Sequence, residues 1–136
     1  MKQNYFKNSI AEMWVEDGIF YIVHAEGNVI TKEIAISHVQ ERLKLTEGIT
    51  YPMFIDSRGV KYVTKEAREY LNKGDGVKYI SAGAFFINSS VSKIIGNYYL
   101  KFTRPPIPAR LFTDHDKALQ WLQRFKQKSN STILKS

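Results

Sequence analysis

The sequence contains no cysteine among its 136 residues, which excludes disulfide bonds, thiolate metal ligands and cysteine nucleophiles. No apolar run approaches the roughly 18–20 residues that a membrane-spanning helix needs. The N-terminal stretch lacks a long apolar core and predicts no secretory signal peptide. The glycine-rich patterns that bind nucleotide phosphates are also missing. These absences favour a cytoplasmic protein with no membrane span and no cofactor.

What is present is the composition of an ordinary globular domain, with 43% hydrophobic and 24% charged residues. The length predicts one domain over residues 1–136, with a folded core over about 10–127 and a polar tail that frays after Lys126. Residues 1–60 hold six basic and eight acidic side chains, a net of −2, whereas residues 61–136 hold fourteen and five, a net of +9. A basic half can attract nucleic acid, anionic lipid or an acidic protein, although scattered basic residues are also typical of solvated helices.

The first half of the chain predicts a β-hairpin and a helix. Residues 11–24 form the hairpin, and Asp17-Gly18 is its turn, because both positions of such a turn favour positive φ. Apolar residues then recur at helical spacing over residues 31–45, which predicts an amphipathic helix. The predicted inward face of this helix consists of Ile36, Val39 and Leu43.

The second half predicts three strand–helix units. The strands are residues 51–56, 79–87 and 110–112, and the helices begin at Thr64, Asn88 and Thr113. The helix that follows Asn88 carries a long apolar ladder, interrupted by Gly96, which suggests a close backbone approach. Alternation of this kind predicts an α/β fold with right-handed crossovers and a mixed sheet of about five strands with about four helices.

Three stretches resemble a known family: FIDSRGVKYVTKEAREYL, AGAFFINSSVSKIIGNYYLKF and PARLFTDHDKALQWL. Their layout is similar to the STAS domain, the SpoIIAA-like fold of anti-sigma-factor antagonists, and especially to its uncharacterised bacterial STAS-like relatives. The resemblance spans about residues 10–127. It implies a SpoIIAA-like fold and a regulatory domain that binds proteins and catalyses no reaction.

One family feature is altered. Anti-sigma-factor antagonists carry an Asp-Ser pair at a helix start, and the serine is phosphorylated. The aligned positions in this chain are Thr64 and Lys65. A lysine cannot accept the phosphoryl group, so the resemblance implies that the phosphorylation switch is lost unless Thr64 or Ser57 takes its place.

Polar residues after two of the predicted strands form the candidate binding site. Asp56 is expected to accept backbone N–H groups of the turn at Ser57-Arg58. The helix start at Asn88-Ser89-Ser90 offers N–H groups that can hold an anion or simply be capped by their own side chains. Because consecutive parallel strands end at one edge of the sheet, these residues are expected to lie together. The predicted binding residues are Asp56, Ser57, Arg58, Thr64, Lys65, Asn88, Ser89 and Ser90.

Aromatic residues supply a second candidate. An apolar ligand pocket is predicted from Phe86, Tyr98, Tyr99 and Phe102, although these spacings are equally typical of core packing. Trp14, Phe20 and Tyr21 on the hairpin suggest an apolar face for a partner or a second copy of the chain. The three histidines are far apart in the sequence and match no metal-ligand spacing.

Three functions follow from these residues. The first hypothesis is a regulatory module without enzymatic activity that binds an acidic protein partner through the rim residues. The alternative is a carrier or sensor of a small apolar or lipid-like ligand. The third is weak binding of nucleic acid by the basic C-terminal half, which lacks a recognised nucleic-acid motif.

Overall fold

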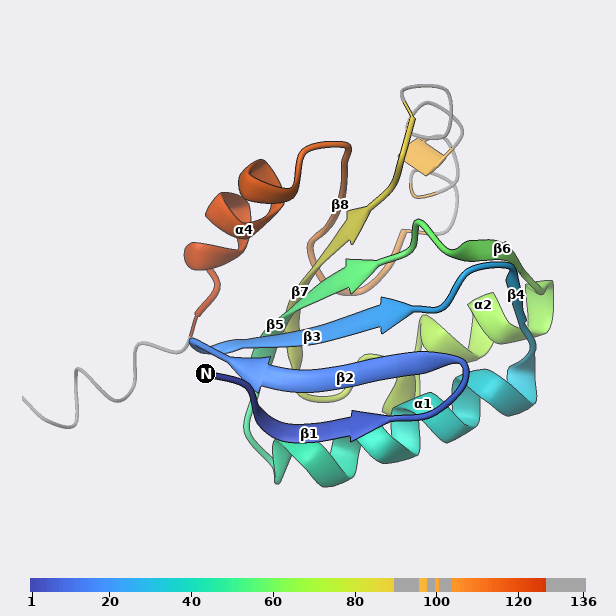
Figure 1. The fold of residues 1–136 in the computed structure, drawn as a ribbon, viewed down its shortest axis with the longest axis horizontal. Helices are drawn as coiled ribbons and strands as arrows, with labels where there is room; N and C mark the ends of the chain where they lie inside the picture. The colour runs from blue at the N-terminus through green and yellow to red at the C-terminus, as the bar shows by residue number, and fades with distance from the viewer. Residues whose placement is uncertain (90–95, 98–99, 101–103, 127–136) are drawn as a thin grey trace, which may run out of the picture.

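A six-stranded mixed sheet forms the centre of the computed structural model, which describes residues 1–89, 96–97, 100 and 104–126 (Figure 1). In spatial order its strands are β1 (Gln3–Lys7), β2 (Ala11–Glu16), β3 (Ile19–His24), β5 (Tyr51–Asp56), β7 (Ile80–Phe86) and β8 (Ala109–Phe112). The first three strands are antiparallel, and β3, β5, β7 and β8 run parallel to one another. The predicted α/β fold with an N-terminal hairpin is confirmed.

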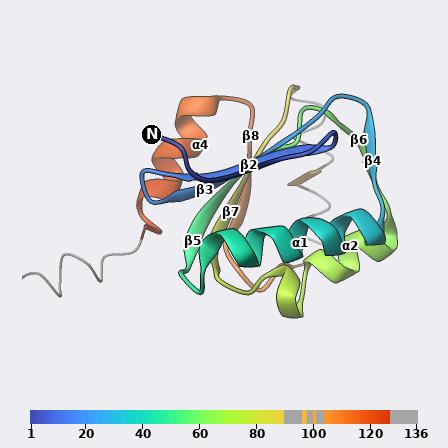
Figure 2. The same ribbon diagram turned by 60° about the horizontal axis from the view of Figure 1, so that its bottom comes forward.

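Helices cover both faces of this sheet. α1 (Lys32–Thr46) and α2 (Lys65–Leu71) lie on one face, and α4 (His115–Gln123) lies on the other (Figure 2). A separate parallel ribbon, β4 (Asn28–Ile30) with β6 (Val60–Val63), and the short 3-10 helix η1 (Gly74–Gly76) complete the described elements. Hence the described residues contain three α-helices where about four were predicted.

The chain start and the segment after β7 differ from the prediction, and the β4–β6 ribbon was not predicted. β1 adds a sixth strand, and its mostly exposed sequence QNYFK carries no apolar alternation that could have predicted it. Much of the helix predicted after Asn88 lies outside the described residues, as does the tail after Lys126. At Gly96 the close approach is confirmed, because a Cβ there would come within 2.5 Å of Leu111 Cδ1.

Local signals place the elements as predicted. Asp17 and Gly18 adopt φ angles of 55° and 79°, as a two-residue hairpin turn requires. Thr64 caps α2 by accepting a hydrogen bond from the backbone N–H of Ala67, and Asp114 caps α4 in the same way from Lys117. The apolar strand β5 is central, with β3 and β7 as its neighbours.

The inward face of α1 was predicted incorrectly. Among the predicted residues only Val39 is buried; Ile36 and Leu43 are half-buried. The face that packs inward instead consists of Ala35, His38, Val39, Arg42 and Thr46. His38 carries a polar ring and Arg42 a charge, so a search for apolar residues at helical spacing does not identify them. Their burial is explained by tertiary contacts that a helix pattern does not contain.

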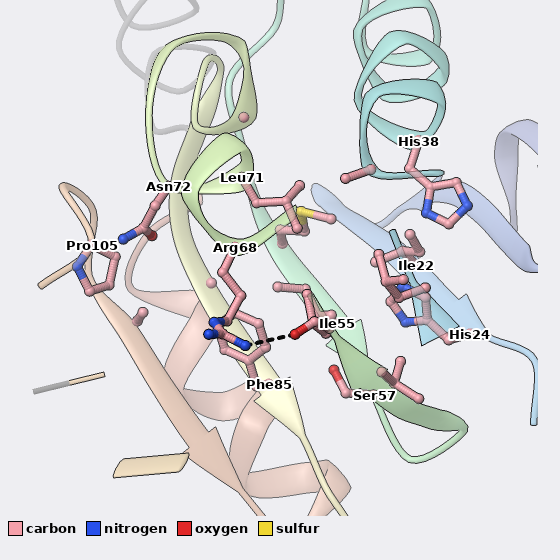
Figure 3. A pocket seen from close by; sticks show the side chains of 18 of the residues that line it. Ile22, His24, His38, Ile55, Ser57, Arg68, Leu71, Asn72, Phe85 and Pro105 are labelled. Atoms are coloured by element: carbon pink, nitrogen blue, oxygen red, sulfur yellow. Dashed lines mark hydrogen bonds between the residues drawn. The ribbon is translucent and has the colours of Figure 1, made fainter. Parts of the chain in front are cut away.

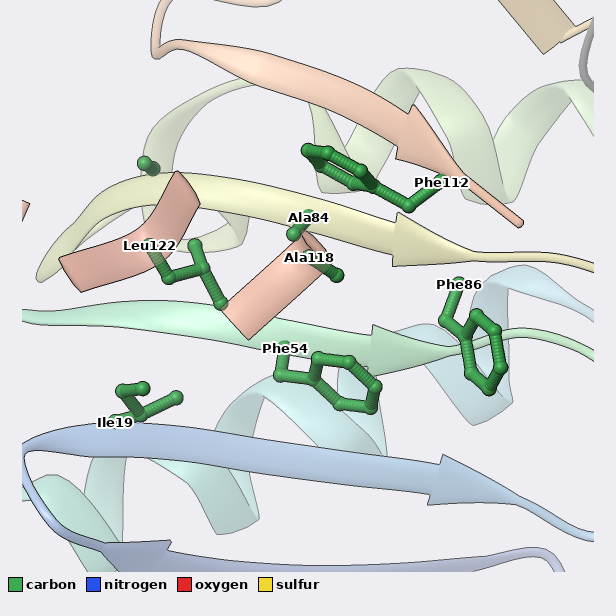
Figure 4. Close-up of a cluster of buried hydrophobic side chains, with 8 residues drawn as sticks. Ile19, Phe54, Ala84, Phe86, Phe112, Ala118 and Leu122 are labelled. Carbon is green, nitrogen blue, oxygen red and sulfur yellow. The ribbon is translucent and has the colours of Figure 1, made fainter. Parts of the chain in front are cut away.

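On the α4 side, the sheet is closed by tight apolar packing (Figure 4). Ala82 and Ala84 on β7 are fully buried, and their small side chains let α4 come close. Leu122 of α4 and Phe54 of β5 fill the space beside them. The apolar stripe of α4 faces this cluster, with Ala118 and Leu122 buried and Leu119 and Phe125 packed against them.

The hairpin aromatics do not form the exposed apolar face that was predicted. Trp14 and Phe20 are only 7% and 1% exposed. Because strand residues alternate, Trp14 pairs with Tyr21 on one face, where their rings stack 5.0 Å apart, while Phe20 packs into the opposite face. Lys2 covers the Trp14 ring, with Nζ 4.1 Å from its centroid. These rings are therefore largely used within the chain.

Candidate functional site

A cavity of about 610 Å³ lies between the sheet and the layer of α1 and α2 (Figure 3). We call it the sheet–helix cavity. The strands line it with every second residue, among them Ile22 of β3, Ile55 of β5 and Phe85 of β7. Gly83 of β7 also lines it and contributes no side chain. Protein interiors are close-packed and leave few voids larger than a water molecule, so an apolar space of this size calls for an occupant.

Arg68 brings a positive charge to this apolar space. It projects from α2, and Figure 3 shows its side chain extending into the cavity toward Phe85. Its Nη1 donates a hydrogen bond of 2.7 Å to the backbone oxygen of Val63. That bond anchors one end of the guanidinium group near the end of β6.

Two histidines line another part of the cavity. The rings of His24 and His38 lie 5.9 Å apart, His24 on β3 and His38 on α1. His24 Nδ1 lies 3.0 Å from the backbone oxygen of Asp56, and a carbonyl only accepts, so Nδ1 carries the proton. In neutral His24 the Nε2 atom is then a hydrogen-bond acceptor. His38 is buried, and its Nε2 has no hydrogen-bond partner among the described residues.

Burial keeps both rings neutral at pH 7. Burial lowers the pKa of His24 below its usual 6.5, although the hydrogen bond to Asp56 and the charge of Asp56 oppose the shift. Burial lowers the pKa of His38 to about 4, and the neighbouring His24 ring contributes to the shift. Among the described residues, no group of three or more His, Asp or Glu side chains is arranged to hold a metal ion.

The turn after β5 sits at the edge of the cavity. Asp56 is buried and, as predicted, accepts a hydrogen bond from the backbone N–H of Arg58, 3.2 Å from Oδ1. It also holds the Arg58 side chain, with Nε 2.9 Å from Oδ1 and Nη2 2.8 Å from Oδ2. This hydrogen bonding raises the pKa of Arg58, whose guanidinium lies 4.4 Å from the ring centroid of Phe86. The turn is thus held by three hydrogen bonds from Arg58 to one carboxylate.

The structure brings together only some of the predicted binding residues. Ser57, Arg58 and Asn88 line the cavity, whereas Thr64 and Lys65 do not. The four residues of β6 separate the turn from the start of α2, a span of roughly 13 Å at the usual rise per strand residue. Lys65 is exposed as the first residue of α2. Ser89 is exposed, and Ser90 lies outside the described residues.

Of the four residues predicted to line an aromatic pocket, the structure describes only Phe86, and Phe86 does not line the cavity. Phe86 lies in the cluster on the α4 side, because the strand alternation that points Phe85 into the cavity points Phe86 away from it. Tyr98, Tyr99 and Phe102 lie outside the described residues. The His115 side chain keeps an exposed fraction of 54% while its ring contacts Phe54 edge-on.

Sequence reasoning missed Arg68 and His38, which bring polar atoms to the cavity. Arg68 lies three residues before the end of α2, where a basic residue ordinarily complements the helix dipole. His38 lies one residue before a predicted core position on α1. For His38 a signal was available in the sequence. Ala35, His38 and Arg42 recur at helical spacing and therefore lie on one face of the helix.

The fold is that of a SpoIIAA-like α/β domain, as the resemblance predicted. A solved structure of an uncharacterised protein of the DUF3478 family, described as having a SpoIIAA-like fold and coming from Shewanella loihica PV-4, superposes with a TM-score of 0.52. It shares 16% sequence identity, and the match covers 90% of this chain and 95% of that one. The chain belongs to the family described as a domain of unknown function, DUF7793, which matches residues 13–126.

No curated protein matches the chain. In the part of the chain that the structure describes, no helix is long and apolar enough to cross a membrane.

Proposed function

We propose that the protein binds a small apolar molecule in the sheet–helix cavity and acts in the cytoplasm as a carrier or sensor of that molecule. The observation that carries the proposal is the cavity of about 610 Å³. Pockets for small molecules typically measure roughly 300–1,000 Å³, with mostly apolar walls and a few polar groups. The walls here fit that description, with Ile22, Ile55 and Phe85 beside His24 and Arg68.

The proposal assigns no catalytic reaction to the site. Ser57, His24 and Asp56 are neighbours, yet they do not form the relay that activates a serine. The carboxylate of Asp56 binds Arg58, and His24 reaches only the backbone oxygen of Asp56. In such a relay a carboxylate orients the histidine. Here a backbone carbonyl oxygen takes the place of that carboxylate.

The test is whether the protein retains or takes up an apolar molecule. Native mass spectrometry of the protein purified from cells is expected to show an additional bound mass, and the neutral dye Nile red is expected to bind saturably at one site. Gly83→Leu fills the cavity and should weaken Nile red binding several-fold, because a Cβ at Gly83 already reaches Ile55 Cδ1 at 3.6 Å. Gln120→Leu, which adds the same side chain at an exposed position of α4, is the control. The proposal would be contradicted if the purified protein carried no additional mass and Nile red showed no saturable binding.

A second candidate function, recognition of an acidic protein, is favoured by the surface around β4 and β6. Val29 and Tyr62 are register partners on these strands, 39% and 55% exposed. The neighbouring Lys61 and Lys65 are exposed too. An exposed aromatic ring flanked by cations is a surface that suits an acidic partner, and such a partner would bind less strongly in high salt.

The double variant Lys61→Glu, Lys65→Glu tests this surface. Capture of an acidic partner should weaken in the variant and fall with added salt in the wild type, whereas Lys117→Glu on α4 should leave capture unchanged. Equal capture by all three proteins would remove this surface from the functional assignment and leave the cavity proposal standing.

A further inference from the structure

Two imidazole rings bring neutral polar atoms to the wall of the sheet–helix cavity. His24 of β3 and His38 of α1 both line the cavity, and their ring centroids lie 5.9 Å apart. We call them the histidine pair. In Figure 3 the two rings lie on one side of Ile55, and Arg68 lies on the other. The histidine pair is therefore a polar feature of the cavity that is separate from the guanidinium group.

The nitrogen atoms of the pair differ in the partners that the chain gives them. His24 Nδ1 donates its proton to the backbone oxygen of Asp56, so Nε2 of the neutral ring is an acceptor. His38 is only 6% exposed, and its Nε2 has no hydrogen-bond partner among the described residues. A buried polar nitrogen without a partner costs free energy. The buried Nε2 of His38 therefore indicates that a bound molecule supplies its partner.

Two charged residues adjoin the histidine pair, and both are bonded within the chain. Arg42, one turn along α1 from His38, donates to two backbone carbonyl oxygens at 2.7 Å and 2.8 Å. The carboxylate of Asp56, whose backbone oxygen meets His24, binds the side chain of Arg58. Burial lowers the pKa of both imidazoles, so the pair is uncharged at pH 7. A group that binds between the two rings therefore meets neutral nitrogen atoms.

A hydroxyl group fits the pair in both directions. It has one proton to donate and lone pairs that accept, so its oxygen can donate to Nε2 of His24 and accept a proton from Nε2 of His38. Each such hydrogen bond measures roughly 2.9 Å, so one oxygen bridges two nitrogens up to roughly 6 Å apart. The ring centroids lie 5.9 Å apart, within that range. A carboxylate or a ketone only accepts and would place a second acceptor against Nε2 of His24.

We propose that the molecule bound in the cavity is a neutral, apolar alcohol whose hydroxyl group bridges His24 and His38. Its apolar body lies against Ile22, Ile55 and Phe85, which line the same cavity. This inference rests on the proposed function, which requires only an apolar occupant. It adds the functional group of the ligand and the two residues that recognise it.

The test compares two isomers, decanol and methyl nonyl ether, as competitors of Nile red at concentrations below their aggregation limits. The methyl group of the ether takes the place of the hydroxyl proton, so the ether oxygen cannot bond to both rings. Decanol is expected to displace the dye at a concentration about tenfold lower than the ether, as two additional hydrogen bonds predict. Equal displacement by the two isomers in the wild-type protein would overturn the alcohol assignment.

Variants of the two histidines show whether the preference belongs to the pair. His38→Leu removes one nitrogen and should reduce the preference for decanol to about twofold, whereas His38→Gln, whose amide can still donate, should keep most of it. His24→Asn keeps an amide that can donate to the backbone oxygen of Asp56, loses the Nε2 acceptor and should reduce the preference in the same way. An unchanged preference in His38→Leu or in His24→Asn would overturn the assignment.

The control is His115→Leu, which removes an imidazole from α4 on the other face of the sheet (Figure 2) and should leave the preference for decanol unchanged. An equal loss of preference in this control would overturn the assignment, because the effect would not belong to the pair. Nile red that binds but is displaced by neither isomer would overturn the alcohol assignment alone. Absence of both a retained mass and saturable Nile red binding would instead overturn the proposed function.

Discussion

The two faces of the sheet are built from alternate residues of the same strands, yet they are packed in opposite ways. On the α4 side, Phe54, Ala84 and Leu122 close the space with apolar atoms alone. On the side of α1 and α2, the neighbours Ile55 and Gly83 border a cavity of about 610 Å³. The α4 face of the sheet is therefore closely packed, whereas the opposite face borders a cavity.

Two polar side chains of α1 are buried on the cavity side, His38 at 6% and Arg42 at 3% exposure. Burying such groups costs free energy unless they find partners. Arg42 finds backbone carbonyls, whereas His38 Nε2 finds none among the described residues. The face that departs from an apolar core is the face to which we assign the function.

Truncating one core residue on each face should give the largest contrast. Phe54→Ala is expected to lower the free energy of unfolding by about 3–5 kcal/mol, because the ring is 2% exposed and closely surrounded. Ile55→Ala should cost less, under about 2 kcal/mol, because its side chain already borders empty space. Urea unfolding of both variants measures the difference. Equal losses would mean that the cavity side is as tightly packed as the other.

Removing the buried cation of α1 should also destabilise the protein. Arg42→Met leaves the carbonyls of Lys78 and Asp75 without their donor and is expected to cost about 2–4 kcal/mol. Lys44→Met, on the exposed side of the same helix, is the matched control and should change stability by less than about 0.5 kcal/mol. Unfolding midpoints that move together in the two variants would show that the Arg42 contacts contribute little.

His38 should make the cavity side sensitive to acid. Its pKa is about 4 in the folded protein and 6.5 in an unfolded chain. The contribution of the neutral ring to stability is therefore complete above pH 6.5 and is lost progressively as the pH falls toward 4, by up to about 3 kcal/mol. His38→Leu should lose less stability than the wild type over this interval. Parallel decline of both proteins in urea unfolding at several pH values would exclude this role.

Adding one side chain to each face gives the smallest expected effect and the closest matched pair. Ala84→Val is expected to cost about 1–3 kcal/mol, because the buried α4 side has no room for two further methyl groups. Gly83→Val, one residue away on the same strand, should change stability by less than about 1 kcal/mol, since its new atoms enter the cavity. Thermal unfolding of the pair distinguishes them. A Gly83→Val variant as unstable as Ala84→Val would contradict the comparison.

Much of the α4 face was predictable from sequence. The continuous apolar run of β5, the small residues at Ala82 and Ala84, and the apolar spacing on α4 are local patterns that the packing follows. The cap at Thr64 and the turn at Asp17-Gly18 were predictable for the same reason, because a few adjacent residues suffice to stabilise them.

The cavity face was predicted less well, for a reason that also explains its chemistry. Arg42 is buried because the carbonyls of Lys78 and Asp75, more than thirty positions away, satisfy it. Phe86 was predicted to line a pocket, but Phe85 lines the cavity instead. Adjacent strand residues point to opposite faces of the sheet, and the sequence does not say which face borders a cavity. Grouping Thr64 and Lys65 with Asn88 assumed that helix starts share one edge, and β6 moves them apart.

The order of strands and helices, the hairpin and the helix caps were already contained in the linear chain, because each depends on neighbours a few residues apart. The open space beside the sheet, the polar residues that were buried around it and the position of Arg68 arose only when distant segments met. Periodicity says which side of a strand is apolar, but whether that side is filled depends on how closely another element can approach it, and no local pattern records that distance.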